Sequence, residues 1–246
     1  MLRKLLERNQ SIMMNSIKNL LSRLLGPIIE ESLDRDSKNI ERSFRRQALS
    51  ETVQLVGNHM KGVPSFPSAL DLLEYAVSVV KDMPPDANLI CEFGVATGRT
   101  INFIAKLIPD VPIFGFDSFE GLPEDWRDGF FKGAFKADSP PKVRRNVRLI
   151  RGRFEDTLGP FLQEHPQSAA FMHIDCDLYA SAKTVLETFR PSIRSGTIIV
   201  FDEYFNYPGW QHGEFKAFAE YIERSDHSFN YIGYCRYHQQ VAIKII

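Results

Sequence analysis

The sequence predicts an α/β protein with a mostly parallel sheet, helices on both faces of the sheet, and a helical extension at the N-terminus. Three observations indicate this fold. From Leu89 onward, apolar runs of strand length alternate with helical patterns, which is typical of a parallel sheet. The first of these runs passes through two glycines directly into a helix. Only a few residues separate the last two apolar runs, so the final strand should be antiparallel to its neighbour.

The composition is that of an ordinary globular protein. The chain has 246 residues, of which 43% are hydrophobic and 25% are charged, enough for one α/β domain with an extension. Its formal net charge of −1 argues against a dedicated nucleic-acid-binding protein. The three cysteines, Cys91, Cys176 and Cys235, form no C-x-x-C pair. We expect core thiols and a cytoplasmic location.

Residues 1–61 are expected to form the helical extension. Apolar residues recur at mostly helical spacing between Leu2 and Leu25, interrupted by basic residues, and Gly26-Pro27 is expected to end this helix. The striped pattern argues against a secretion signal or a membrane span. A basic amphipathic helix can pack on its own domain or on a second subunit, or lie on a membrane surface. We expect a homodimer or larger assembly through this helix, and no membrane contact.

Residues 62–246 are expected to form the main domain. After a turn cluster at 62–67, the pattern predicts helices at 69–83, 100–107, 156–163, 180–189 and 212–224. It predicts strands at 89–92, 113–116, 147–151, 170–175 and 197–201, and a hairpin of 229–237 with 240–246.

A glycine-rich turn follows the first of these strands. It reads Glu92-x-Gly94-x-x-x-Gly98 and continues through Thr100 into a helix. The glycines let backbone N–H groups approach a ligand, and the helix start adds unpaired donors. Asp117 ends the next strand, 23 residues after Gly94, close to the ~20 expected for an acid that binds ribose hydroxyls. The segment predicts a site for a nucleotide-like cofactor.

Acidic residues follow the next two predicted buried strands. Asp175 and Asp177 come after the fourth strand, and Asp202 and Glu203 come after the fifth. Asp175 and Asp177 share a face if the strand continues through them. Four carboxylates at neighbouring strand ends would repel one another, so a divalent metal ion or a cationic cofactor should offset them. The alternative is structural: Asp177 caps a helix and the strand ends are hydrogen-bonded. We expect His173 to be a satisfied core histidine rather than a metal ligand.

Two loops are candidates for the walls of an acceptor site. Residues 117–142 lack periodicity but contain several aromatic residues, which favours a lid over the site. The alternative is a loop whose aromatic residues fill a small core of their own. Residues 204–214 combine aromatic and hydrogen-bonding side chains, which suits a sugar, a polyol or a phenol. His212 in this segment is a second candidate for a catalytic base.

These stretches together resemble the class I methyltransferases, and among them the macrocin O-methyltransferase family, which methylates sugar hydroxyls. The acid two residues before the first glycine and the absence of G-x-G-x-x-G carry the resemblance, with the acidic stretches described above. It covers roughly residues 62–246. It implies a Rossmann-like fold with a seven-stranded sheet whose last strand is antiparallel, S-adenosyl-L-methionine as cofactor, and Mg²⁺.

The family pattern also implies roles for individual residues. The residues implied to bind the cofactor are Glu92, Gly94, Gly98, Thr100, Asp117, Ser118, Phe154, Asp156 and Asp175. Phe154 would contact the adenine, and Asp156 would bind its amine or, alternatively, cap the helix that follows. The metal ligands would be Asp175, Asp202 and Glu203, with Asp177 as the base that deprotonates the acceptor. The family more often has Asp-Asp where this chain has Asp202-Glu203, and a longer side chain can shift the metal site.

The sequence thus predicts an S-adenosylmethionine-dependent O-methyltransferase that acts on a small hydroxylated acceptor with the help of Mg²⁺. One alternative is an NAD-dependent oxidoreductase, which the missing third glycine disfavours. The other is a non-catalytic scaffolding protein with the same fold, which the clustered carboxylates disfavour.

Overall fold

The computed structural model describes residues 2–80 and 87–246. The chain divides into two compact units, Met1–Gln47 and Ala48–Ile246. Helix α2 (Ile40–His59) crosses this division. The assignment of residues 1–61 to an extension and 62–246 to a methyltransferase domain stays a prediction.

The first unit consists of α1 (Leu2–Ser37) and the start of α2. The helix end expected at Gly26-Pro27 is wrong, because α1 continues through Pro27 to Ser37. A proline removes one backbone donor and strains the preceding turn, which weakens a helix without always ending it. An i,i+4 ion pair between Arg35 and Glu31, 2.8 Å apart, supports the part that follows the proline. No helix in the described ranges is both long enough and apolar enough to cross a bilayer.

The second unit is built on an eight-stranded sheet in the order β1-β7-β8-β6-β5-β2-β3-β4. The strands are β1 (Ser65–Phe66), β2 (Ala87–Phe93), β3 (Ile113–Asp117), β4 (Val147–Arg151), β5 (Ser168–Ile174), β6 (Ile198–Phe201), β7 (Phe229–Cys235) and β8 (Val241–Ile245). Strand β8 is antiparallel to β6 and β7, and the other pairs are parallel, which confirms the predicted fold class. The additional strand is β1, which lies in the segment predicted as a turn cluster. Two residues are too few to give a strand pattern.

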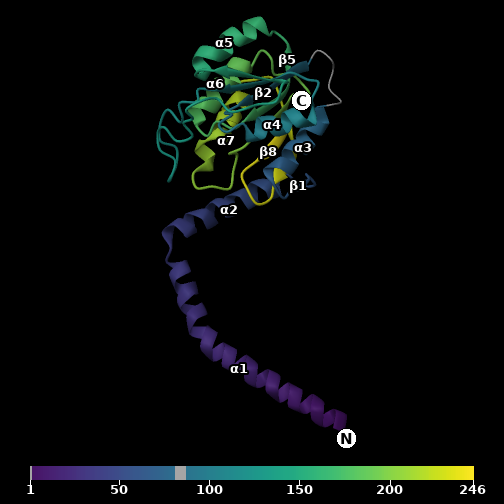
Figure 1. Ribbon diagram of the computed structural model, residues 1–246, viewed down its shortest axis with the longest axis vertical. Coiled ribbons are helices and arrows are strands. Elements are labelled where there is room, and N and C mark those ends of the chain that lie inside the picture. Colours follow the sequence, from purple (N-terminus) through teal and green to yellow (C-terminus); the bar gives the residue numbers. More distant parts are fainter. Residues whose placement is uncertain (1, 81–86) are drawn as a thin grey trace. The chain divides into compact units, whose positions relative to one another are not determined.

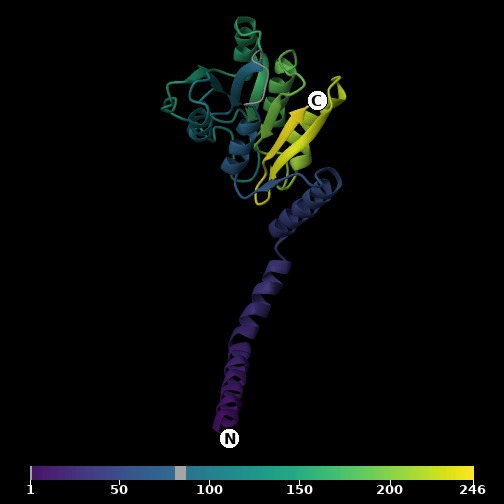
Figure 2. The same cartoon turned by 90° about the vertical axis from the view of Figure 1, so that its right-hand side faces the viewer.

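Helices cover both faces of the sheet (Figures 1 and 2). Helices α3 (Ala69–Val80) and α4 (Arg99–Leu107) pack on one face. Helices α5 (Phe154–Glu164), α6 (Tyr179–Phe189) and α7 (Glu214–Glu223) pack on the other. The short 3₁₀ helix η1 (Trp210–His212) directly precedes α7. The end of α3 predicted at residue 83 lies outside the described residues.

The sheet core brings the carboxyl ends of four parallel strands, β2, β3, β5 and β6, to one edge, where ligands bind in folds of this kind. Phenylalanine rings in stacked and edge-to-face contact pack against these strands in the core. Phe93 and Phe116, for example, are stacked with 5.3 Å between their ring centroids. The three cysteines are buried and free, as expected for core thiols.

Candidate active site

A cavity of about 550 Å³ opens at the carboxyl ends of these strands. The sequence-predicted site residues that line it are Gly94, Asp117, Ser118, Phe154, Asp175, Asp177 and Glu203. Other predicted residues within the described ranges are not part of its wall, namely Glu92, Gly98, Thr100, Asp156, Asp202 and His212. The strand order therefore gathers residues that are more than 100 positions apart in the sequence, such as Gly94 and Glu203, at one cavity.

Gly94 sets the distance between β2 and β5 at the cavity. Its φ is +92°, and a Cβ at this position would lie 1.7 Å from the carbonyl oxygen of Asp175. Only glycine fits such a close approach of two backbones. The first glycine of the motif is therefore explained by contact with the acidic loop as well as by access for a ligand.

Asp117, at the end of β3, is hydrogen-bonded to the backbone of the glycine-rich turn. Its Oδ2 accepts hydrogen bonds from the backbone N–H groups of Val95 (2.9 Å) and Ala96 (2.8 Å). Its Oδ1 accepts a third from the N–H of Phe119 at 2.7 Å. Each carboxylate oxygen has two lone pairs, so Asp117 keeps one acceptor position on Oδ1 beside the cavity.

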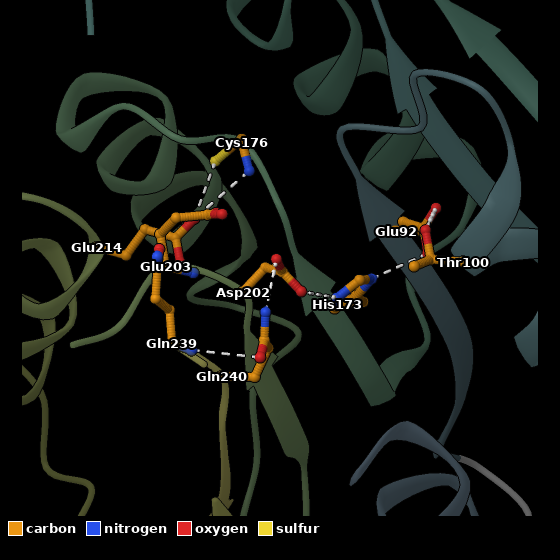
Figure 3. A network of polar contacts seen from close by, with 9 residues as sticks. All are labelled: Glu92, Thr100, His173, Cys176, Asp202, Glu203, Glu214, Gln239 and Gln240. Atoms are coloured by element: carbon orange, nitrogen blue, oxygen red, sulfur yellow. Dashed lines mark hydrogen bonds and ion pairs between the residues drawn. The ribbon is translucent and has the colours of Figure 1, made fainter. Parts of the chain in front are cut away.

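Glu92 lies beneath the turn in a buried polar chain (Figure 3). It is fully buried, and its carboxylate accepts a bond from Thr100 Oγ1 at 3.0 Å and contacts His173 Nδ1 at 2.9 Å. His173 Nε2 lies 3.7 Å from Asp202 Oδ1 and has no hydrogen-bond partner among the described residues. His173 is thus only partly satisfied. Burial lowers its pKa, but the carboxylates of Asp202 and Glu92 leave that pKa well above its ordinary value.

The acidic residues form two overlapping groups that could each hold a metal ion. One group is His173, Asp175 and Asp202, and the other is Asp175, Asp177 and Glu203. Within each group the ligand atoms lie within 4.8 Å of one another, and Asp175 belongs to both groups. The predicted set of Asp175, Asp202 and Glu203 is therefore distributed over both groups, with Asp175 in common.

Strand alternation does not bring Asp175 and Asp177 to the same side, because the strand does not continue through them. Strand β5 ends at Ile174, and Asp177 has a left-handed φ of +63°, so the two residues do not share the face of a continuing strand. The capping alternative for Asp177 also fails, because the N-cap of α6 is Leu178 and no side chain caps it. A sharp turn after β5, rather than strand alternation, directs Asp177 to the cavity.

Burial and mutual repulsion oppose the simultaneous ionisation of the carboxyl groups in the cluster. Burial, followed by repulsion from Asp202, raises the pKa of Asp175 and of Glu203 well above the ordinary range. Burial also raises the pKa of Asp177 to about 7, although Arg127 opposes this rise. For Asp202 burial acts in the same direction, but the neighbouring His173 and a hydrogen bond from Gln240 leave its pKa lowered. A bound cation would favour the charged forms of all four groups.

The donor set suits a hard divalent cation. Glu203 is 7% exposed, lines the cavity, and its Oε2 has no hydrogen-bond partner within the described structure. Carboxylate oxygens are the ligands that Mg²⁺ prefers. The glutamate that stands in place of the more usual aspartate therefore still brings a carboxylate into a group with Asp175 and Asp177.

The long loop between β3 and β4 forms one wall of the cavity through residues including Trp126, Arg127 and Phe130. The Arg127 guanidinium lies 3.7 Å from the centroid of the Trp126 ring and 5.0 Å from that of Tyr207, and it donates to Gln239 Oε1 at 3.1 Å. The loop aromatics thus pack on one another and also border the cavity. Sequence reasoning missed Arg127, whose only signal was its place within the aromatic tract.

Phe154 lines the cavity, whereas Asp156 does not. Helix α5 begins at Phe154, which lines the cavity, and its N-cap is Arg153 without a side-chain bond. The predicted capping role of Asp156 is wrong, because this residue lies exposed within the first turn of the helix. His212, in η1, is also exposed. Their roles as adenine partner and second base stay predictions.

The strand order and the cavity at the strand ends are those of a Rossmann-like class I methyltransferase fold. A family model described as a methyltransferase domain matches residues 91–204, which span the glycine-rich turn and both acidic loops. This match favours the methyltransferase interpretation over the oxidoreductase alternative.

The individual proteins that resemble this chain are named as methyltransferases. Demethyldecarbamoylnovobiocin O-methyltransferase of Streptomyces niveus is 28% identical over 122 residues, which are 41% of this chain and 45% of that protein. The chain thus aligns with less than half the length of this curated relative. Among solved structures, calicheamicin methyltransferase CalS11 superposes with a TM-score of 0.58 at 24% identity, over 84% of this chain and 93% of that one. The O-methyltransferase NovP gives 0.55 at 22% identity, over 71% and 78%. These structures share the fold.

Proposed function

We propose that this chain is an S-adenosylmethionine-dependent O-methyltransferase that acts on a hydroxyl of a small molecule, of the macrocin O-methyltransferase type. The observation that carries this proposal is a single cavity lined by Gly94 and Asp117 of the cofactor motif and by Asp175, Asp177 and Glu203 of the acidic cluster. The similarity to a demethyldecarbamoylnovobiocin O-methyltransferase and to CalS11, a TDP-rhamnose 3'-O-methyltransferase, supports a sugar or related hydroxylated acceptor.

We assign the cofactor to the part of the cavity at β2 and β3. Backbone groups of the glycine-rich turn, the free acceptor position of Asp117 and the ring of Phe154 would bind it. The cofactor supplies a methyl group on a sulfonium that can move in line to a nucleophilic oxygen. The buried Glu92 and the half-buried Thr100 would act indirectly here, by holding the start of α4 against β2.

Following the family pattern, we assign Mg²⁺ to Asp175, Asp202 and Glu203. Asp175 would be the central ligand, because it is common to both acidic groups. A bound divalent ion would orient acceptor oxygens and lower the pKa of a hydroxyl. Asp177, which lines the cavity, would accept the hydroxyl proton, because an alkoxide is a much stronger nucleophile than an alcohol. The aromatic residues Trp126 and Phe130 would hold the apolar face of the acceptor.

We also propose that the protein works in the cytoplasm and assembles through α1. The buried free cysteines fit a reducing compartment. Apolar side chains from Met13 to Leu33 are exposed on α1, and a band of this size is rarely left in water on a monomer.

A two-stage experiment tests the enzymatic proposal. Calorimetry should show stoichiometric binding of S-adenosylhomocysteine and no binding of NADH. Transfer of a labelled methyl group to a panel of sugars, polyols and phenols, with and without Mg²⁺, should then identify the acceptor class. Absence of S-adenosylhomocysteine binding would contradict the proposal, and NADH binding would favour the oxidoreductase.

A further inference from the structure

Glu214, the first residue of α7, is a buried acid at the end of the aromatic segment 204–214. It is 0% exposed, and burial raises its pKa to about 8. A buried carboxyl group is costly unless it is hydrogen-bonded. The bonds that Glu214 makes therefore indicate why an acid occupies this position.

The side-chain carboxyl group of Glu214 accepts hydrogen bonds from both acidic loops (Figure 3). Its Oε2 accepts a hydrogen bond from the backbone N–H of Glu203 at 3.0 Å. Its Oε1 accepts from the backbone N–H of Cys176 at 3.4 Å. Cys176 stands between Asp175 and Asp177, and Glu203 directly follows Asp202. The two bonds thus connect the loop after β5 to the loop after β6.

The start of α7 is held closely against these loops. A Cβ at Gly213 would lie 2.3 Å from the hydroxyl oxygen of Tyr207, and that hydroxyl donates to the backbone carbonyl of Glu203 at 3.4 Å. A larger residue at 213 would displace the helix start. The position of Glu214 relative to both loops is therefore fixed by packing as well as by its own bonds.

We propose that Glu214 is a positioning residue that sets the spacing of the metal ligands. The carboxylates of the two loops repel one another, and the bonds of Glu214 act on the backbone beside them to keep the loops together. Glu214 is not among the residues that line the cavity, so its contribution is indirect. The inference rests on the metal site proposed above.

Three variants test this role. Glu214→Ala removes both bonds, and Glu214→Gln keeps one amide oxygen as an acceptor. Glu220→Gln is the matched control, because Glu220 lies on the same helix and pairs with Lys183 at 3.0 Å, outside the cluster. For each variant, Mn²⁺ affinity is measured by electron paramagnetic resonance, S-adenosylhomocysteine affinity by calorimetry, and melting temperature in EDTA.

Glu214→Ala should bind Mn²⁺ at least tenfold more weakly and S-adenosylhomocysteine within twofold of wild type. Glu214→Gln should fall between, and Glu220→Gln should match wild type. Wild-type Mn²⁺ affinity in a folded Glu214→Ala or Glu214→Gln protein would overturn the positioning role, as would an equal loss of S-adenosylhomocysteine binding. If wild type itself takes up no Mn²⁺, the metal site of the proposed function is wrong and this inference falls with it.

Discussion

The Oδ2 atom of Asp117 lies 2.8 Å from the backbone nitrogen of Ala96, so the acid at the end of β3 holds the turn at the end of β2. This bond is one of three backbone N–H bonds to the same carboxylate. Asp117 therefore shapes the cofactor loop in addition to the ribose contact that we propose for it.

Asp117→Ala should weaken S-adenosylhomocysteine binding by more than tenfold and also lower stability. Hydrogen bonds to a charged group contribute ~1.5–3 kcal/mol each, so the loss should be evident in both measurements. Calorimetry and urea unfolding check this, with Asp110→Ala, an exposed acid beyond α4, as control. Unchanged cofactor affinity would remove Asp117 from the site.

The metal-free protein should lose stability as pH rises from about 4 to about 8. Asp177 and Glu214 have folded-state pKa values of about 7 and about 8, above their ordinary values of 3.8 and 4.5. Their protonated forms are favoured by folding, so the stabilisation present at low pH is lost as pH rises through these values. In EDTA the melting temperature should fall over this range, and Mg²⁺ should raise it more at pH 8.5 than at pH 6. A flat profile in EDTA would contradict the account of the cluster.

Removing residues 1–39 should convert an oligomer into a monomer. The deletion ends between α1 and α2 and takes away the exposed apolar band, which we propose as the assembly surface. Light scattering measures the mass. Leu21→Glu with Leu24→Glu should act like the deletion, whereas Ser22→Glu should leave the mass unchanged. Equal association states for the full-length and shortened chains would show that α1 does not mediate assembly.

Substitutions in the acidic cluster should separate metal binding from proton transfer. Asp202→Asn should lower methyl transfer to the acceptor found by screening, with partial recovery at high Mg²⁺. Asp177→Asn should keep cofactor and metal binding but slow turnover by ~10²–10⁴-fold without rescue, if it supplies general-base catalysis. Rescue of Asp177→Asn by Mg²⁺ would instead make Asp177 a metal ligand.

The sequence predicts the features that depend on local patterns, namely the strands and the acidic residues at their ends. Strand β4 was predicted with its observed bounds, Val147–Arg151, because apolar content and turn residues mark it on both sides. Asp117 and the acidic loops were also found, since the ends of buried strands are recognisable.

What the sequence could not predict depends on contacts between distant segments. Strand β1 exists through its pairing with β7. Glu214 is important because its carboxyl reaches two loops, and His173 because it lies between Glu92 and Asp202. No spacing rule brings these residues together before the strand order is known.

Mn²⁺ titration of wild type and Asp175→Asn tests the central claim most directly, because Asp175 is the residue shared by both acidic groups at the cofactor cavity. Electron paramagnetic resonance should detect one bound ion per wild-type chain and at least tenfold weaker binding in Asp175→Asn, with S-adenosylhomocysteine still bound by the variant. Equal Mn²⁺ binding by the two proteins, or none by wild type, would contradict a metal site in the acidic cluster.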